Sequence, residues 1–390
     1  MGEKKSMASE SATLCIATST IGKLSETFIR RHVEKLAPGN CVFLISGYVD
    51  QPDGKWDLPG AVFCRSEWRK RNRLLLGIVR RMGIDLEALA VRRFLKRHNV
   101  RVVLSEFLGS SLRVHQMVKP LGVRFYAHAH GHDVSARLRD PAYRKAYLAY
   151  ENDPLAGVVT MSQVTVDRLA SIGISESKLH LIPYGVEIPE ESELARVETT
   201  DSTIRCLAVG RMVAKKAPIV LLEAFRQALK RNPSLHLSYV GGGPLYSAVE
   251  QFVKVMGLEN HVDLHRSLAH GEVLALFQKA DIFLQHSRVD PDSGDEEGLP
   301  LSILEAMARG VPVVSTRHAG IPEAVIEGEC GMLSDENDQK AMAENILRLA
   351  EDSELRSRMG LEARKRAASQ YSWEREKTQL LELLALPPAE

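Results

Sequence analysis

The stretch EEGLPLSILEAMARGVPVVSTRHAGIPEAV (296–325) carries the most specific pattern in this chain of 390 residues. Glu297 and Glu305 stand eight residues apart, and a Gly-Leu-Pro loop leads from the first glutamate into a helical apolar pattern. On one continuous helix both carboxylates would lie near the same side. Main-chain N–H groups at a helix N-terminus favour a phosphate, and carboxylates bind sugar or ribose hydroxyls. The stretch therefore indicates a ligand site, and a solvated amphipathic helix is the alternative from spacing alone.

Short apolar runs alternate with helical patterns along almost the whole chain, which is typical of parallel sheets with crossover helices. The expected strands form two groups, at 12–17, 41–46, 101–106, 123–128 and 157–161, and at 206–210, 236–240, 262–265, 281–284 and 312–316. An acidic segment with two prolines, 182–203, separates the groups and places the hinge near residues 185–190. The predicted fold class is α/β, with Rossmann-like parallel-sheet domains at 1–187 and 188–370 facing a central cleft.

The composition is that of an ordinary globular protein, with 44% hydrophobic residues and a mean hydropathy of −0.15. The net charge of +1 argues against a nucleic-acid binder, which would carry a strong basic excess. Five cysteines without CxxC spacing suggest neither a disulfide framework nor a zinc site, and they fit a reducing cytoplasm. No apolar run reaches the roughly 18–20 residues of a membrane span.

The net charge is the sum of opposite contributions from the two halves. Residues 1–187 carry 28 basic and 18 acidic residues, whereas residues 188–390 carry 23 and 32. The basic excess is concentrated at 65–101, where WRKRNRLLLGIVRRM (68–82) would place apolar residues on one face of a helix among six basic residues. Those apolar residues are Leu75, Ile78, Val79 and Met82. Such a helix fits an anionic membrane surface, and packing on the sheet with a solvated basic face is the equal alternative.

A histidine-rich segment suggests a competing interpretation, a metal site. HAHGHD (128–133) places His128, His130 and His132 directly after an expected strand, as in the metal site of a hydrolase. No second histidine cluster follows in the sequence, so this reading ranks lower. Neither a Walker-type phosphate loop nor an HExxH zinc motif occurs.

The 296–325 stretch resembles the signature of family 4 glycosyltransferases, retaining enzymes of the GT-B fold, which runs EGxPxxxLEAMAxGxPVV with seven residues between its two glutamates. Other segments resemble further motifs of this family: VGRMVAKKAP (209–218), VGGGP (240–244) and GIPE (320–323). In the first domain, the segments STIGKLSETFIRRHVEKL (19–36), AHGHDVS (129–135) and IPYGVE (182–187) are similar to the branch with colanic-acid and other exopolysaccharide enzymes.

The resemblance implies roles for individual residues. Arg211 and Lys216 match the pair that grips the donor pyrophosphate, Glu297 the residue that holds donor-sugar hydroxyls, and Glu305 the one that binds the ribose. His130 matches the first-domain histidine near the donor sugar. Two fixed cations would also stabilise the charge that builds on the leaving group.

Further positions follow from the same resemblance. His128 is the reserve for His130 if the register is shifted. The remaining donor-binding positions are Gly22, Leu268, Gly298, Leu299 and Pro300. Residues 371–390 are expected to form a helix that packs back on the first domain. Two departures stand out: Ala217 replaces the usual Gly after Lys216, and Tyr184 replaces a frequent Asn, which we expect to affect only the hinge turn.

The implied reaction is transfer of a hexose, with retention, from a nucleoside-diphosphate sugar to a glycan or lipid-linked glycan in polysaccharide biosynthesis. UDP is expected ahead of GDP, no metal cofactor is expected, and the enzyme would work in the cytoplasm or on the inner face of the cytoplasmic membrane. The alternatives are a metal-dependent hydrolase that uses His128, His130 and His132, and a non-transferring GT-B relative such as a sugar-nucleotide epimerase.

Overall fold

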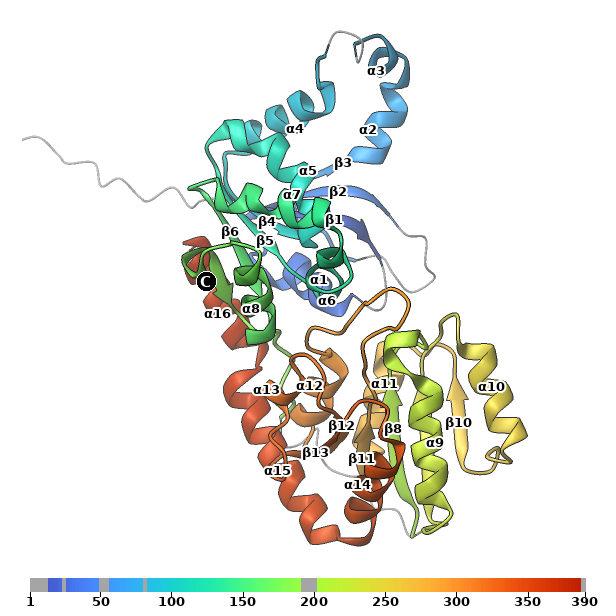
Figure 1. The fold of residues 1–390 in the computed structure, drawn as a ribbon. Helices are drawn as coiled ribbons and strands as arrows, with labels where there is room; N and C mark the ends of the chain where they lie inside the picture. The colour runs from blue at the N-terminus through green and yellow to red at the C-terminus, as the bar shows by residue number, and fades with distance from the viewer. Residues whose placement is uncertain (1–12, 23–25, 49–55, 80–82, 191–201, 387–390) are drawn as a thin grey trace, which may run out of the picture.

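Two α/β domains make up the chain, as Figure 1 shows with one domain above the other. The computed structural model describes residues 13–22, 26–48, 56–79, 83–190 and 202–386. Each domain is built on one parallel sheet, and the chain passes between the domains twice, at residues 182–190 and again at 371–373. The predicted fold class is confirmed.

The first sheet has seven parallel strands in the order β3-β2-β1-β4-β5-β6-β7. The strands are β1 Thr13–Ile21, β2 Cys41–Tyr48, β3 Val62–Cys64, β4 Val100–Glu106, β5 Arg124–His128, β6 Ala156–Thr160 and β7 Leu179–Leu181. The longer helices are α4 Leu86–Arg97, α5 Leu108–Val118, α7 Pro141–Glu151 and α8 Gln163–Ser171, and the shorter ones include α1 Thr27–Arg31, the π-helical turn η1 His32–Leu36 and α6 Gly131–Val134. Helices α4, α5, α7 and α8 share one core with the sheet, whereas α1 and η1 pack on its other face.

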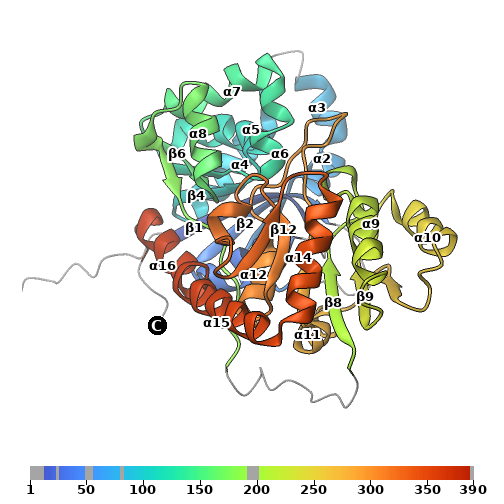
Figure 2. The ribbon, with the colours of Figure 1, turned by 60° about the horizontal axis from the view of Figure 1, so that its bottom comes forward.

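The second sheet has six parallel strands in the order β10-β9-β8-β11-β12-β13. They are β8 Ile204–Val209, β9 Leu235–Val240, β10 Val262–His265, β11 Ile282–Leu284, β12 Val313–Thr316 and β13 Gly331–Ser334. The helices are the short turn η7 Ala214–Lys216, then α9 Pro218–Leu229, α10 Tyr246–Val255, α11 His270–Lys279, α12 Leu301–Ala308, α13 Ile321–Ala324, α14 Gln339–Glu351 and α15 Ser353–Gln370. Helices α9 and α14 lie side by side on one face, and α12 and α15 on the other (Figure 2).

All ten strands expected from the sequence are present, and the three that were missed share a position. The missed strands β3, β7 and β13 lie at sheet edges and have only three or four residues. Central parallel strands are buried on both faces and therefore appear in the sequence as continuous apolar runs. The three missed edge strands lack that signal, whereas β10, also a short edge strand, was predicted.

The predicted basic helix at 68–82 is wrong as one continuous element. Instead, α2 (Arg65–Arg71) and α3 (Arg73–Val79) are separated at Asn72. Asn72 is the C-cap of α2, and both its main-chain N–H, at 3.1 Å, and its side-chain amide, at 2.8 Å, donate to the Trp68 carbonyl oxygen. Met82 lies outside the described residues, and the side chains of Ile78 and Val79 are not described. None of the helices in the described ranges combines the length and apolar character of a membrane-spanning segment.

Helix α16 (Trp373–Leu384) follows the second crossing and lies against the first domain (Figure 1). Leu380 and Leu384 are fully buried in a cluster that includes Leu14 of β1. Arg124 of β5 donates to the carbonyl oxygen of Leu384 at 2.7 Å. The end of the chain therefore completes the core of the domain in which the chain begins.

Replacing Leu380 with alanine should lower the free energy of unfolding by about 2–5 kcal/mol, because the vacated space is enclosed by the first-domain core. Urea denaturation measures the change. Leu361→Ala is the control, since Leu361 is 54% exposed on α15 and should change stability by less than about 0.5 kcal/mol. Equal losses in both variants would contradict the packing of α16 described above.

Candidate active site

A cavity of about 820 Å³ lies between the two domains and receives residues from both. It collects nearly every site residue that the sequence predicted: His130, Arg211, Lys216, Leu268, Glu297, Gly298, Leu299, Pro300 and Glu305. Gly22 is not among the lining residues; it is buried at the end of β1 with φ of +104°. The cavity lies at carboxyl ends of strands, since β8 leads into Gly210 and β5 leads into His130.

The floor of the cavity is a cluster of opposite charges. Lys216 Nζ lies 3.3 Å from one oxygen of Glu297, and Lys215 Nζ lies 3.4 Å from the other and 3.0 Å from Asp295. Burial alone would raise the pKa of Glu297, but Lys216 and Lys215 lower it to about 2. Glu297 is therefore ionised at neutral pH and can accept hydrogen bonds. Lys215 was not predicted as a site residue, although it adjoins Lys216.

Local backbone geometry places the two lysines. They lie in η7, and Ala217 follows in the left-handed region with φ of +38° before Pro218 opens α9. Ala217 is the position at which the sequence departs from the usual glycine, so this chain adopts a turn that glycine would adopt at lower cost. Within the described ranges, the guanidinium of Arg211 makes no hydrogen bond or ion pair, and this exposed side chain lines the cavity.

The two glutamates reach the cavity from different kinds of structure. Helix α12 begins at Leu301, so Glu297 lies in the preceding loop and Glu305 in the second turn. The two residues are thus not on one helix, although both line the cavity. Pro300 is the N-cap of α12 and also lines the cavity, so the positive end of this helix is directed at the same space.

A histidine behind the loop fixes the main chain of Glu297. His318 Nε2 accepts a hydrogen bond from the Glu297 N–H at 3.2 Å, and His318 Nδ1 lies 2.6 Å from an oxygen of Glu336. Because Nε2 accepts, the proton must reside on Nδ1, so His318 is neutral and has one tautomer. No motif or spacing in the sequence predicted this role for His318.

The first domain contacts this loop through the main chain at Gly131 and through the side chains of Ser135 and Arg168. A Cβ at Gly131 would lie 2.6 Å from both the Glu296 carbonyl oxygen and the Gly298 nitrogen. The Ser135 hydroxyl accepts from the Glu296 N–H at 3.0 Å, and Arg168 pairs with the Glu296 carboxylate at 2.6 Å. Only glycine permits this approach of the two domains.

The predicted site histidines separate into different environments. His130 uses both ring nitrogens inside the protein: Nε2 lies 3.1 Å from Glu106, and Nδ1 is hydrogen-bonded to the Tyr184 hydroxyl. Any contact of His130 with a ligand must therefore come from its ring face or main chain while these bonds persist. The expectation that Tyr184 affects only the hinge turn is wrong, because its hydroxyl bonds this site residue.

The remaining histidines do not assemble the metal site of the competing reading. His128 is buried, with Nδ1 3.3 Å from Glu106, whereas the side chain of His132 is 54% exposed and lies 3.4 Å from Asp295. The candidate metal group among the described residues instead joins His128 to Glu106 and to His32. His128, His130 and His132 thus do not converge on one point.

Gly131→Ala should separate the two domains at this contact. An overpacking cost of about 1–3 kcal/mol, imposed by main-chain atoms that cannot rotate away, should speed amide hydrogen exchange in residues 295–300 at least about fivefold. Gly271→Ala is the control, because a Cβ there meets nothing within 4 Å. If exchange in this loop were unchanged in Gly131→Ala, the contact described above would be wrong.

Two family profiles match consecutive parts of the chain. The profile described as Glycosyltransferase Family 4 matches residues 57–189, and the one described as Glycosyl transferases group 1 matches residues 191–366. Together they cover well over half of the 390 residues. The boundary between them coincides with the first crossing between the domains.

Named relatives agree with these profiles. The chain is 29% identical to a GDP-mannose-dependent alpha-(1-6)-phosphatidylinositol monomannoside mannosyltransferase of Mycolicibacterium smegmatis over 76% of this chain and 79% of that protein. It is 30% identical to WcaL of Salmonella typhimurium, named for colanic acid biosynthesis, over 65% of this chain. The match spans only 62% of the length of WcaL.

A solved structure shows the same fold. HepE of Anabaena, crystallised in complex with UDP, superposes with a TM-score of 0.77 at 17% identity, covering 96% of this chain and 99% of HepE. With the profiles and the relatives, this superposition confirms the resemblance that the motifs indicated. The chain belongs to the family 4 glycosyltransferases of the GT-B fold.

Proposed function

We propose that this enzyme transfers a hexose from a nucleoside-diphosphate sugar to a hydroxyl group of a glycan or lipid-linked glycan, with retention at the anomeric carbon. The observation that carries the proposal is the cationic wall of the interdomain cavity. Arg211 lines it without a partner in the described ranges, and Lys216 lies beside it. Such a wall fits the diphosphate of a donor, and Glu297, ionised nearby, fits the hydroxyls of its sugar.

The chemistry needs few protein groups. The bond between the anomeric carbon and the diphosphate oxygen breaks while the acceptor oxygen bonds to the same face of that carbon. The acceptor proton passes to an oxygen of the departing diphosphate, so no side chain acts as a nucleophile. Arg211, Lys216 and the N-terminus of α12 would stabilise the negative charge that develops on the leaving group.

These cations also support a reaction without a divalent metal. Arg211, Lys215 and Lys216 line the cavity, and Arg211, which has no ion pair in the described ranges, can supply positive charge that a metal ion would otherwise provide. We therefore propose that turnover persists in EDTA.

The nucleotide base of the donor has two candidates, uracil and guanine. The sequence favoured UDP ahead of GDP, whereas a relative at 29% identity is GDP-mannose-dependent. A panel of UDP-, GDP- and ADP-sugars, read by thermal shift and by release of the nucleotide, separates the bases. Failure of every sugar nucleotide to bind would contradict the proposed function.

Alanine at Arg211 or Lys216 should reduce kcat by more than about tenfold, because each removes a charge that stabilises the leaving diphosphate. Steady-state assays with the donor identified above measure the effect, and circular dichroism checks the fold. Lys254→Ala is the matched control, since Lys254 is an exposed lysine on α10. Near-normal turnover in the first two variants would exclude the assigned phosphate role.

We further propose that the acceptor is presented at an anionic membrane surface and that α2 and α3 contact it. Leu74 is 87% exposed and Leu75 is 49% exposed at the start of α3, beside the exposed basic residues Lys70, Arg71 and Arg73. The break at Asn72 removes the single amphipathic helix but leaves apolar and basic side chains together. This combination fits insertion of leucine below a layer of anionic headgroups.

Leu74→Glu should weaken flotation with vesicles of mixed phosphatidylcholine and phosphatidylglycerol by at least about fivefold, because it buries a carboxylate and repels the headgroups. Val255→Glu is the control, since Val255 is 73% exposed on the second domain. Binding of the unaltered enzyme should fall as salt rises. An enzyme that fails to float at any salt concentration would contradict the membrane contact.

A further inference from the structure

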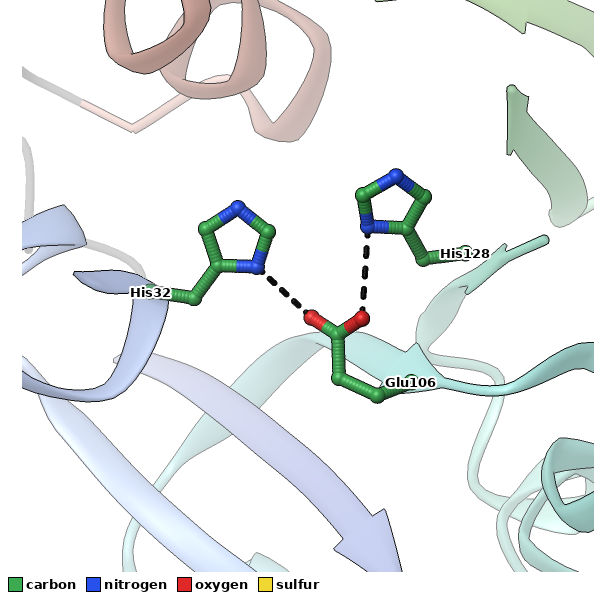
Figure 3. A group of neighbouring side chains, drawn as sticks. All are labelled: His32, Glu106 and His128. Atoms are coloured by element: carbon green, nitrogen blue, oxygen red, sulfur yellow. Dashed lines mark hydrogen bonds and ion pairs between the residues drawn. The ribbon is translucent and has the colours of Figure 1, made fainter. Parts of the chain in front are cut away.

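A buried group of charges lies behind the cavity, in the first domain. Figure 3 shows the Glu106 carboxylate between the rings of His32 and His128. Glu106 ends β4, His128 ends β5 and His32 opens η1, so three separate elements bring them together. All three side chains are at most 1% exposed.

Glu106 is the centre of a longer chain of hydrogen bonds. Its Oε1 lies 2.7 Å from His32 Nδ1, and its Oε2 lies 3.1 Å from His130 Nε2. On the far side, His32 Nε2 lies 3.0 Å from Glu376 on α16. The other oxygen of Glu376 accepts from the Gly185 N–H at 2.7 Å, so the chain of contacts ends in the first crossing between the domains.

The partners of His32 determine its protonation. Each of its ring nitrogens faces a carboxylate, which can only accept, so both nitrogens must carry a proton. Burial lowers the pKa of His32, but Glu106 and Glu376 raise it far more, and the net shift is upward. The buried cation thereby compensates two buried carboxylates.

This protonation argues against a metal ion in the group. A metal ligand needs a nitrogen lone pair, and a doubly protonated His32 has none. Neither ring nitrogen of His128 makes a hydrogen bond, but its Nδ1 lies 3.3 Å from the Glu106 carboxylate, so only Nε2 of His128 faces no carboxylate of this group. One histidine and one carboxylate already used by His32 do not make a closed site.

We propose that Glu106 is a positioning residue for His130, and that His32 and Glu376 tie it to the crossing between the domains. The Glu106 carboxylate requires the proton of His130 on Nε2, which leaves Nδ1 to accept from the Tyr184 hydroxyl. Glu106 and Tyr184 thus determine the ring orientation and the tautomer of His130, and His130 also lines the cavity. The inference rests on the proposed function for its kinetic consequence only.

The network also ends where the domains are joined. Gly185 donates to Glu376 and accepts from Arg31 through its carbonyl oxygen, so both of its main-chain groups are held. Tyr184, which bonds His130, is the preceding residue. A change in backbone conformation at Gly185 would therefore affect His130 by two routes. One is direct, through Tyr184, and the other passes through Glu376, His32 and Glu106.

Nitrogen-15 NMR of histidine-labelled enzyme tests the network without any substrate. At pH 8, His32 should show two protonated ring nitrogens, and His130 should be the Nε2–H tautomer; single variants assign the signals. Glu106→Gln should convert His130 to a mixture of tautomers. A neutral His32, or an unchanged His130 in Glu106→Gln, would overturn the proposal, as would a stoichiometric metal ion that is lost in His128→Ala.

Kinetics then separate positioning from a purely structural role. Glu106→Gln, or Glu376→Gln if the first variant does not fold, should lower kcat about tenfold or more with the KM for the donor changed less than about twofold. The control is Asp153→Asn, which removes a comparable buried contact, 2.7 Å from His115 and away from the cavity. It should cost stability but not kcat, and equal kcat losses in the control would overturn the positioning role.

If the unaltered enzyme transfers no sugar, the proposed function fails while the NMR result still decides the network.

Discussion

The loop at 295–300 is the constraint on which the arrangement of both domains depends. Within the second domain, Lys215 donates a hydrogen bond to the Glu296 carbonyl oxygen at 3.0 Å, and His318 accepts one from the Glu297 N–H. From the first domain, Gly131 packs directly on the same main chain. Because this contact joins main chain to main chain, it has little freedom to adjust through side-chain rotation. The cavity therefore has a fixed edge at the position where the first domain meets Glu297.

Charge within the cavity is arranged to be balanced before any ligand binds. Glu297 and Asp295 offset Lys215 and Lys216, which lowers the cost of holding these partly buried ions. Arg211 makes no ion pair in the described ranges, is exposed, and acts on Glu297 and Lys216 only through its electrostatic field. Under the proposed function, Arg211 would be the first of these cations to contact the diphosphate of the donor. Sugar hydroxyls would then replace Lys216 as donors to Glu297, and Lys216 would become available to the diphosphate.

Residues in contiguous motifs and in central strands could be predicted from the sequence, whereas side-chain contacts between distant positions could not. Glu297, Arg211 and Lys216 lie in motifs of contiguous residues, and the central strands carry their own apolar signal, so both were predictable. His32, Glu106 and Glu376 are separated by up to 344 positions and acquire meaning only when the fold brings them together. The break at Asn72 was missed because no Gly or Pro marks it in the sequence, where Asn72 stands between Arg71 and Arg73.

The two crossings between the domains are themselves joined, which limits how the domains can move. Val186 bonds Tyr371 and Trp373 through its main chain at 2.8 and 2.9 Å, and a Cβ at Gly185 would lie 2.5 Å from the Ser372 carbonyl oxygen. The two crossing segments are therefore fixed to each other rather than independent. Tyr184, next to Gly185, bonds His130, whereas Glu376 bonds Gly185 and His32. The contacts that join the two crossings and those that orient His130 consequently involve neighbouring residues of the same segment.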